Sequence, residues 1–169
     1  IVSGDHAYQI RDGSHMRIGL FGGSTDKAIY QTAPGGDFEV QCKRILFGPS
    51  QQLTGPLIVD SSGNGVLCSF NGTNNQFVIW TLSGWAYSSN VGVVTEQSIG
   101  HYGEHGAMPV WFGLKKVGTT YSARFSADGI AWSAYNTGGT VAMTVAYIGY
   151  GRIFANTANW VDLDWFDVV

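Results

Sequence analysis

Short apolar and aromatic segments, separated by glycine-rich turns, recur along the whole chain, and this spacing is the strongest constraint on its fold. Turn signals such as APGGD, DSSGNG, NGTNN and NTGG lie between them. No segment of helix length carries apolar side chains at positions i, i+3, i+4 and i+7, the pattern of an amphipathic helix. About eleven strands at this spacing predict an all-β sandwich, jelly roll or barrel. The expected strands are residues 16–22, 27–33, 37–47, 54–60, 65–71, 76–82, 108–117, 120–126, 131–135, 140–150 and 160–169.

The composition supports the same fold class. Glycine makes up 24 of the 169 residues and aromatic residues make up 14%, and these residue types favour turns and strands respectively. The length is that of one domain, spanning residues 1–169. Because the chain begins at Ile1 rather than at methionine, we expect this domain to be excised from a longer protein.

Charge and hydropathy argue against two classes of partner. The formal net charge is −3, and no stripe of basic residues marks a surface for nucleic acid. No apolar run approaches the roughly 18 residues of a membrane-spanning helix. We therefore expect neither nucleic-acid binding nor insertion into a membrane.

The two cysteines, Cys42 and Cys68, each lie in a strand-like segment. Free cysteine behaves as a small apolar side chain in protein cores, so we expect two buried thiols. A disulfide between them stays open at this stage, because the sequence does not give the Cα separation that such a bond needs.

Alternation along three segments separates a core face from an outward face. Successive side chains of a strand point to opposite sides of the sheet. Trp111, Lys115 and Arg124 fall on outward faces by this rule. The predicted core positions are Phe38, Val40, Cys42, Val110, Phe112, Leu114, Tyr121, Ala123 and Phe125.

The stretch from Val110 to Trp132 resembles the central hairpin of concanavalin A-like lectin/glucanase domains. Residues 35–45 look like the first long strand of that family, and residues 146–151 and 161–169 look like its last two strands. The resemblance covers about half of the chain. It implies a two-sheet antiparallel jelly-roll sandwich with one concave sheet, a fold found in lectins, carbohydrate-binding modules, glycosidases and phage fibre tips. The matching positions of the hairpin are Trp111, Phe112, Leu114, Lys115, Lys116, Gly118, Tyr121, Phe125, Ser126, Asp128, Gly129 and Trp132.

Catalysis is not expected from the sequence. Glycoside hydrolysis normally uses two carboxylates flanking the scissile bond, and hydrolases of the resembling family carry them on one strand as Glu, apolar, Asp, apolar, apolar, Glu. No such string occurs. Asp162 and Asp164 share a face of the last strand, but their apolar neighbours indicate a structural role. No GxSxG motif of a nucleophilic serine is present either.

A metal site is not expected, although two clusters carry the right residue types. His101, Glu104 and His105 lie close together, but the glycines around them favour a polar loop over the helix that would align two histidines. Asp128 is explained as the residue of a DG turn. We expect no cofactor, and a structural calcium ion held by such aspartates stays open.

Binding is the remaining function, and aromatic residues beside polar ones are its best candidates. Aromatic faces stack on the apolar faces of sugars, while amide and charged groups bond the hydroxyls. Trp132, Trp160 and Trp165 are assigned to the core. The predicted ligand-binding residues are Trp80, Trp85, Tyr87, Asn90, Tyr102, Trp111 and Arg124.

The sequence therefore predicts a non-catalytic glycan-binding domain. One setting is the receptor-binding module of a phage tail or virion fibre that recognises host surface polysaccharide, with an extracellular or virion-surface location and assembly into an oligomer. Two alternatives stay open. The first is a structural, oligomerisation or capsid-decoration domain, and the second is an accessory module or cryptic glycoside hydrolase.

Overall fold

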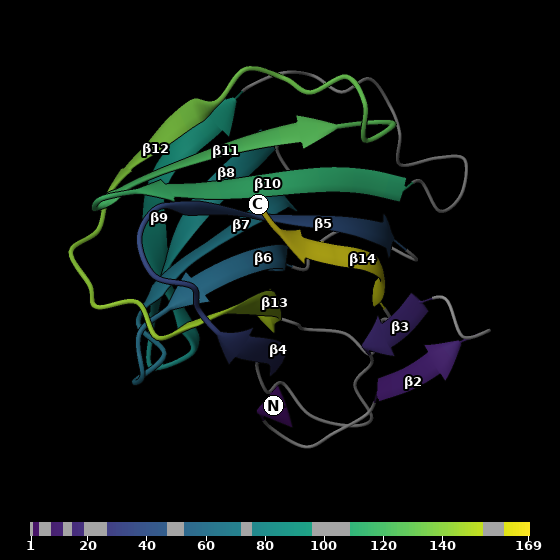
Figure 1. Cartoon of the computed structure of the whole chain (residues 1–169), viewed down its shortest axis with the longest axis horizontal. Coiled ribbons are helices and arrows are strands. Elements are labelled where there is room, and N and C mark those ends of the chain that lie inside the picture. The colour runs from purple at the N-terminus through teal and green to yellow at the C-terminus, as the bar shows by residue number, and fades with distance from the viewer. Residues whose placement is uncertain are drawn as a thin grey trace.

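Two antiparallel sheets face each other in the protein (Figure 1). The structure, a computed structural model, describes residues 2–3, 8–11, 15–18, 27–46, 53–71, 76–95, 109–153 and 161–169. In order across sheet A lie β1 (Val2–Ser3), β4 (Lys27–Thr32), β13 (Tyr147–Ile153), β6 (Leu53–Val59), β7 (Gly65–Asn71), β8 (Gln76–Ser83) and β9 (Ala86–Thr95). In order across sheet B lie β12 (Asn136–Thr140), β11 (Thr120–Ser126), β10 (Pro109–Val117), β5 (Phe38–Leu46), β14 (Val161–Val168), β3 (His15–Ile18) and β2 (Tyr8–Arg11). The two-sheet jelly-roll sandwich predicted from the sequence is confirmed. Within these ranges no helix is long and apolar enough to cross a membrane.

The space between the sheets holds the main core. Phe38, Val40 and Cys42 of β5 are buried in it, as their alternation predicts. On the neighbouring strands Phe112 pairs with both Cys42 and Phe125, so the apolar positions of β5, β10 and β11 fall in one layer. The fully or nearly buried members of this core are Phe38, Val40, Cys42, Ile58, Val66, Cys68, Ile79, Phe112, Leu114, Tyr121, Ala123, Ile148, Tyr150 and Leu163.

The central strands of sheet A are also buried on their other face. Ile58 of β6 belongs to the main core, whereas its neighbours Leu57 and Val59 point to the opposite side and have no exposed surface. Strands buried on both faces have continuous apolar runs rather than alternating ones, and LIV of β6 and FVIW of β8 are such runs. The second core consists of Ala28, Leu57, Val59, Leu67, Val78, Trp80 and Leu82.

Several element boundaries differ from the sequence prediction. Residues 88–108 are the least strand-like segment of the sequence, yet β9 extends to Thr95 and pairs with β8 through three register shifts. The expected strand at 131–135 is reduced to one isolated bridge between Ser126 and Trp132. The strand lies instead at Asn136–Thr140, where the NTGG sequence indicates a turn. At β9 and β12, pairing with a neighbouring strand outweighs the local preference of the residues.

The hairpin between β8 and β9 turns through Gly84 and Trp85, which both have positive φ, 58° and 71°. Two such residues are typical of a type I′ turn, but this backbone is unusual for a bulky side chain. The Trp85 N–H donates to the carbonyl of Gly63 at 2.9 Å, and the ring lies where a Cβ on Gly63 would collide with it. The ring also contacts Tyr30, with 4.9 Å between centroids. These contacts hold the hairpin tip against the turn at residues 60–64.

Both cysteines are buried and free. Cys42 lies on β5 in sheet B, and Cys68 lies on β7 in sheet A. The expectation of two buried thiols is confirmed, and the two side chains belong to the same core.

Replacement of Tyr121 by phenylalanine tests the packing of the main core. Among the described residues, the hydroxyl of Tyr121 is buried with no hydrogen-bond partner. An unsatisfied buried polar group costs free energy, so Tyr121→Phe is expected to raise the free energy of unfolding by about 1 kcal/mol, measured by urea denaturation. Tyr121→Ala is the opposite control and should lower it by about 3–5 kcal/mol.

Alkaline titration gives a second readout of the same residue. Burial raises the pKa of Tyr121 to about 12 from 10.0. The unfolded chain then loses this proton first, so stability should fall as the pH rises from 10.0 towards 12. The loss should be smaller in Tyr121→Phe. If that variant is less stable than the parent at neutral pH, the hydroxyl makes a hydrogen bond and this account is wrong.

Candidate functional site

The outer face of sheet B, the side that points away from sheet A, carries polar and aromatic side chains on its central strands. Glu39 and Lys43 of β5 alternate with core residues, and Trp111 and Lys115 of β10 do the same. The ladder places Lys43 opposite Trp111, and Glu39 opposite Lys115. Sheet B faces the viewer in Figure 1 with sheet A behind it. This face is therefore separate from both apolar cores.

An ion pair crosses the middle of this face. Nε and Nη2 of Arg124 donate to Oε1 and Oε2 of Glu39 at 2.8 and 2.9 Å. Arg124 lies on β11 and Glu39 on β5, so the two side chains meet above β10. Gly113 of β10 makes this contact feasible, because a Cβ at that position would collide with Oε1 of Glu39. The side chain of Glu39 is 6% exposed and that of Arg124 is 21% exposed, so the pair is well shielded from water.

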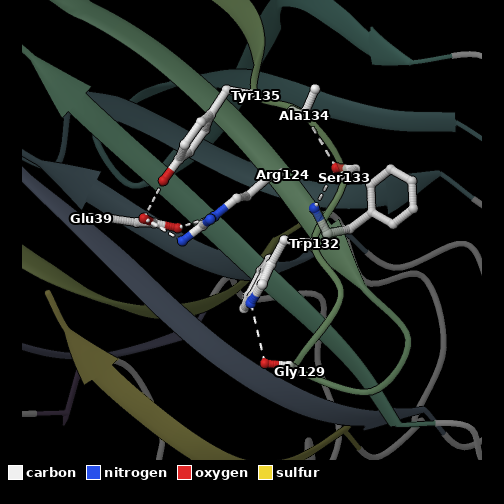
Figure 2. Close-up of polar contacts among 8 residues, drawn as sticks. Glu39, Arg124, Gly129, Trp132, Ser133, Ala134 and Tyr135 are labelled. Atoms are coloured by element: carbon white, nitrogen blue, oxygen red, sulfur yellow. Dashed lines mark hydrogen bonds and ion pairs between the residues drawn. The ribbon is translucent and has the colours of Figure 1, made fainter.

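Two aromatic rings flank the guanidinium of Arg124. Its Cζ lies 4.4 Å from the centroid of the Trp132 ring and 4.7 Å from that of Tyr135. Figure 2 shows the Arg124 side chain running between these rings towards Glu39. The hydroxyl of Tyr135 donates to Oε2 of Glu39. Burial, then this hydrogen bond and the negative charge of Glu39, raise the pKa of Tyr135 well above its ordinary range.

The segment after β11 brings both rings to this position. Ser133 N–H donates to the Phe125 carbonyl at 2.9 Å, so the chain returns beside β11. The turn is fixed by Asp128, whose carboxylate accepts the N–H groups of Ile130 and Ala131 at 2.8 and 2.9 Å. These hydrogen bonds lower the pKa of Asp128. The expected DG turn is present, and the residue with positive φ is Gly129, at 79°.

A second pair of rings lies on the same face, further along the strands. The Trp111 and Trp165 rings are 5.1 Å apart between centroids, and Nζ of Lys43 lies 5.6 Å from the Trp111 ring. Gly129 packs on Trp111, because a Cβ there would meet the ring at 2.6 Å. Trp111, Trp132 and Trp165 are all partly buried. The face therefore presents four rings whose positions are set by neighbouring groups.

The sequence-predicted binding residues divide between the two sheets. Trp111 and Arg124 lie on the outer face of sheet B. Trp80 is 9% exposed in the second core, where its Nε1 donates to Ser69 Oγ at 2.8 Å, and these contacts give it a structural role. Trp85 is partly buried at the β8–β9 turn of sheet A.

Three further predicted residues cannot be placed in the site. Tyr87 and Asn90 belong to β9, opposite Leu82 and Trp80, and their side chains are outside the described part. Tyr102 lies outside the described residues, as does the HYGEH segment. Within the described ranges, no three His, Cys, Asp or Glu side chains gather into a group suited to a metal ion.

Four residues of this face were missed or misassigned by the sequence analysis. Trp132 and Trp165 are assigned to the core there, but both are partly buried on the outer face, and Trp160 lies outside the described residues. Trp165 carries no local signal of this position, because its two-residue spacing from the core residue Leu163 predicts the inner face, and a register shift between these residues turns it outward. Glu39 and Tyr135 carry no local signal of their meeting, because 96 positions separate them in the chain.

Comparison with known proteins identifies the fold. No protein-family model and no curated protein matches the chain. Among solved structures, the exoplasmic/lumenal domain of VIP36, in its Ca2+/Man3GlcNAc-bound form, has a TM-score of 0.66 and 10% identity, with 96% of this chain and 82% of that chain covered. A functionally unknown protein from Saccharomyces cerevisiae has a TM-score of 0.64 and 8% identity, with 100% and 95% covered.

A glycoside hydrolase shares the same sandwich as part of a larger molecule. The xylan beta-1,4-xylosidase from Bacillus halodurans C-125 has a TM-score of 0.59 and 16% identity over 91% of this chain. The chain spans only 32% of the length of that enzyme. At these identities the likeness establishes the fold, which is the concanavalin A-like jelly roll expected from the sequence.

Removal of Arg124 should reveal how far the ion pair stabilises the protein. Arg124→Met leaves the shielded carboxylate of Glu39 without its cation, so we expect the free energy of unfolding to fall by about 3 kcal/mol, measured by urea denaturation. The matched control is Lys115→Met on the same face, which should change it by about 0.5 kcal/mol or less.

A double-mutant cycle separates the pair from its two members. Combining Arg124→Met with Glu39→Gln removes both charges, so the double variant should be more stable than the sum of the single losses predicts, by at least about 1 kcal/mol. Strict additivity would mean that the two side chains do not stabilise each other.

Proposed function

We propose that this concanavalin A-like sandwich is a glycan-binding domain and that the glycan lies along the outer face of sheet B. The observation that supports this is the group of four partly exposed rings, Trp111, Trp132, Tyr135 and Trp165, held by contacts on one face. Tryptophan and tyrosine combine a large apolar surface with a polar tip. Such rings stack on the apolar C–H faces of sugars, and polar neighbours bond the hydroxyls.

The rings are positioned before any ligand arrives. Trp132 donates its Nε1–H to the Gly129 carbonyl at 3.2 Å, and Tyr135 is anchored to Glu39 by its hydroxyl. Trp111 is fixed between Trp165 and Gly129. Side chains that are already ordered lose less conformational entropy on binding, so this face suits recognition of a weakly interacting ligand such as a sugar.

Sheet A offers a weaker alternative site. Tyr30, Trp85 and Tyr147 form a cluster there, with ring centroids 4.9 and 4.8 Å from Tyr30. Tyr30, Trp85 and Tyr147 pack against the second core, and Trp85 also fixes the hairpin tip through Gly63. These contacts give the cluster a structural role, so we assign the ligand to sheet B.

We further propose that the face binds glycan without cleaving it. Hydrolysis normally needs a carboxyl group to protonate the leaving oxygen and a second carboxylate as base or nucleophile. Glu39 lies beside the rings, but both of its oxygens accept hydrogen bonds from Arg124 or Tyr135. Its charge is used to hold the face together, and binding in this way requires no cofactor.

The names of two structural neighbours agree with a carbohydrate-related role. One is a domain solved with Man3GlcNAc and the other is a xylosidase. The finer form of our proposal is a module exposed on a virion or outside the cell that recognises host surface polysaccharide as part of a larger assembly.

Glycan binding by variants of the two aromatic clusters tests the proposal. The parent protein is screened on an array of bacterial, fungal and plant polysaccharides, and the best ligand is titrated by calorimetry. Trp111→Ala and Trp165→Ala should each weaken binding at least about tenfold, because each removes a central aromatic contact. The matched control, Trp85→Ala on sheet A, should bind as the parent does.

Thermal unfolding shows whether each variant is folded at the temperature of the assay. Trp111→Phe, which keeps a ring of smaller area, serves if Trp111→Ala does not fold. The assignment to sheet B is wrong if Trp85→Ala abolishes binding while folded Trp111 and Trp165 variants retain it. A silent array together with a stable oligomer in solution would favour a structural domain instead.

A further inference from the structure

Lys115 is a cation on the outer face of sheet B that no carboxylate neutralises within the described ranges. We propose that Lys115, together with the ring of Tyr135, binds the acidic group of a negatively charged glycan, such as the carboxylate of a uronic acid. This inference rests on the proposed function and names the class of sugar that the face selects.

The natural partner of Lys115 is already occupied. Lys115 of β10 is directly opposite Glu39 of β5, and opposite charges at such positions normally pair across strands. Both oxygens of Glu39 instead accept from Arg124, and Oε2 also accepts from Tyr135. Arg124 thus takes the one carboxylate that the described ladder places opposite Lys115.

Lys116, the next residue along β10, differs from Lys115 because oxygen atoms already lie beside its ammonium group. Nζ of Lys116 donates to the Gly36 carbonyl at 2.9 Å and lies 3.9 Å from Oδ1 of Asp37. Nζ of Lys115 has a ring as its neighbour, 4.8 Å from the centroid of Tyr135. A cation over an aromatic ring keeps its full charge and can still receive an anion. Lys115 therefore offers an ammonium group that Lys116 does not.

The position of Lys115 suits a sugar that carries both an apolar face and a negative charge. Tyr135 is 37% exposed, so its ring can contact the C–H groups of a sugar while the adjacent ammonium contacts the carboxylate. Trp111 lies four residues away along β10, which is about 13 Å at the usual rise of a strand. A glycan chain that stacks on Trp111 and runs along β10 would then reach Lys115 with a sugar unit further along the chain.

The test compares each acidic glycan with its carboxyl-reduced counterpart. Oligogalacturonate, oligomannuronate and glucuronoxylan fragments, and the reduced form of each, are titrated into the whole protein by calorimetry. The parent should bind at least one acidic form about tenfold more tightly than its reduced form. Lys115→Met should bring that ratio close to one without changing the affinity for the reduced form, and Lys115→Arg should retain it.

Lys116→Met is the matched control and should keep the full preference for the acidic form. Raising the salt concentration should reduce the preference of the parent, because exposed charges are screened. Equal binding of acidic and reduced forms by the parent, or an unchanged ratio in Lys115→Met, would overturn this inference and leave the proposed glycan site standing. Binding of no acidic or reduced glycan, and of no other sugar on the array, would overturn both.

Discussion

The buried carboxylate of Glu39 needs a positive charge and hydrogen-bond donors beside it, and the outer face of sheet B is arranged to supply them. A charge with almost no contact with water is costly unless it is paired and hydrogen-bonded, and Glu39 is 5% exposed. Arg124 supplies the charge and two hydrogen bonds, and Tyr135 supplies a third. Gly113 leaves the space in which they meet. Because Tyr135 takes part, the segment after β11 is tied across the face, and its rings come to lie beside Arg124.

The two sheets differ in how much surface they leave for a ligand. The central strands of sheet A are buried on both sides, since Ile58 and Leu57 on adjacent positions of β6 face opposite cores and neither has exposed surface. Sheet B buries only its inner side in the main core. Its outer side keeps rings and charges that are partly open to solvent. This difference supports our proposal that the ligand lies on sheet B.

The concanavalin A-like fold by itself leaves the function open, because a fold hosts many functions. The same sandwich occurs in the exoplasmic/lumenal domain of VIP36, solved in a Ca2+/Man3GlcNAc-bound form, and in part of a xylosidase. The case for binding rests on the local chemistry of one face, where the carboxylate of Glu39 is engaged by Arg124 and Tyr135. Because Arg124 pairs with Glu39, the ammonium group of Lys115 is not paired with the carboxylate on the opposing strand.

Much of the sandwich is predictable because strand periodicity is a local property. Alternation in residues 37–43 places Phe38, Val40 and Cys42 in the core, and the structure agrees. The Trp111 to Trp132 motif indicates the hairpin of β10 and β11, and both strands are present. Strands β9 and β12 could not be found in this way, because serine, asparagine or glycine residues interrupt their apolar pattern, and the strands are defined by their pairing with β8 and β11.

Parts of the candidate site could not be predicted from the local sequence. Leu163 is in the core, and a period of two would place Trp165 there as well, which is how the sequence assigns it. The ladder shifts register between these residues, so Trp165 pairs with Lys43 and turns to the outer face. By itself the sequence determined the strand pattern, the core alternation and the hairpin. Only the tertiary structure decided the bulge in β14 and the meeting of Glu39, Arg124 and Tyr135, because both depend on contacts between strands far apart in the chain.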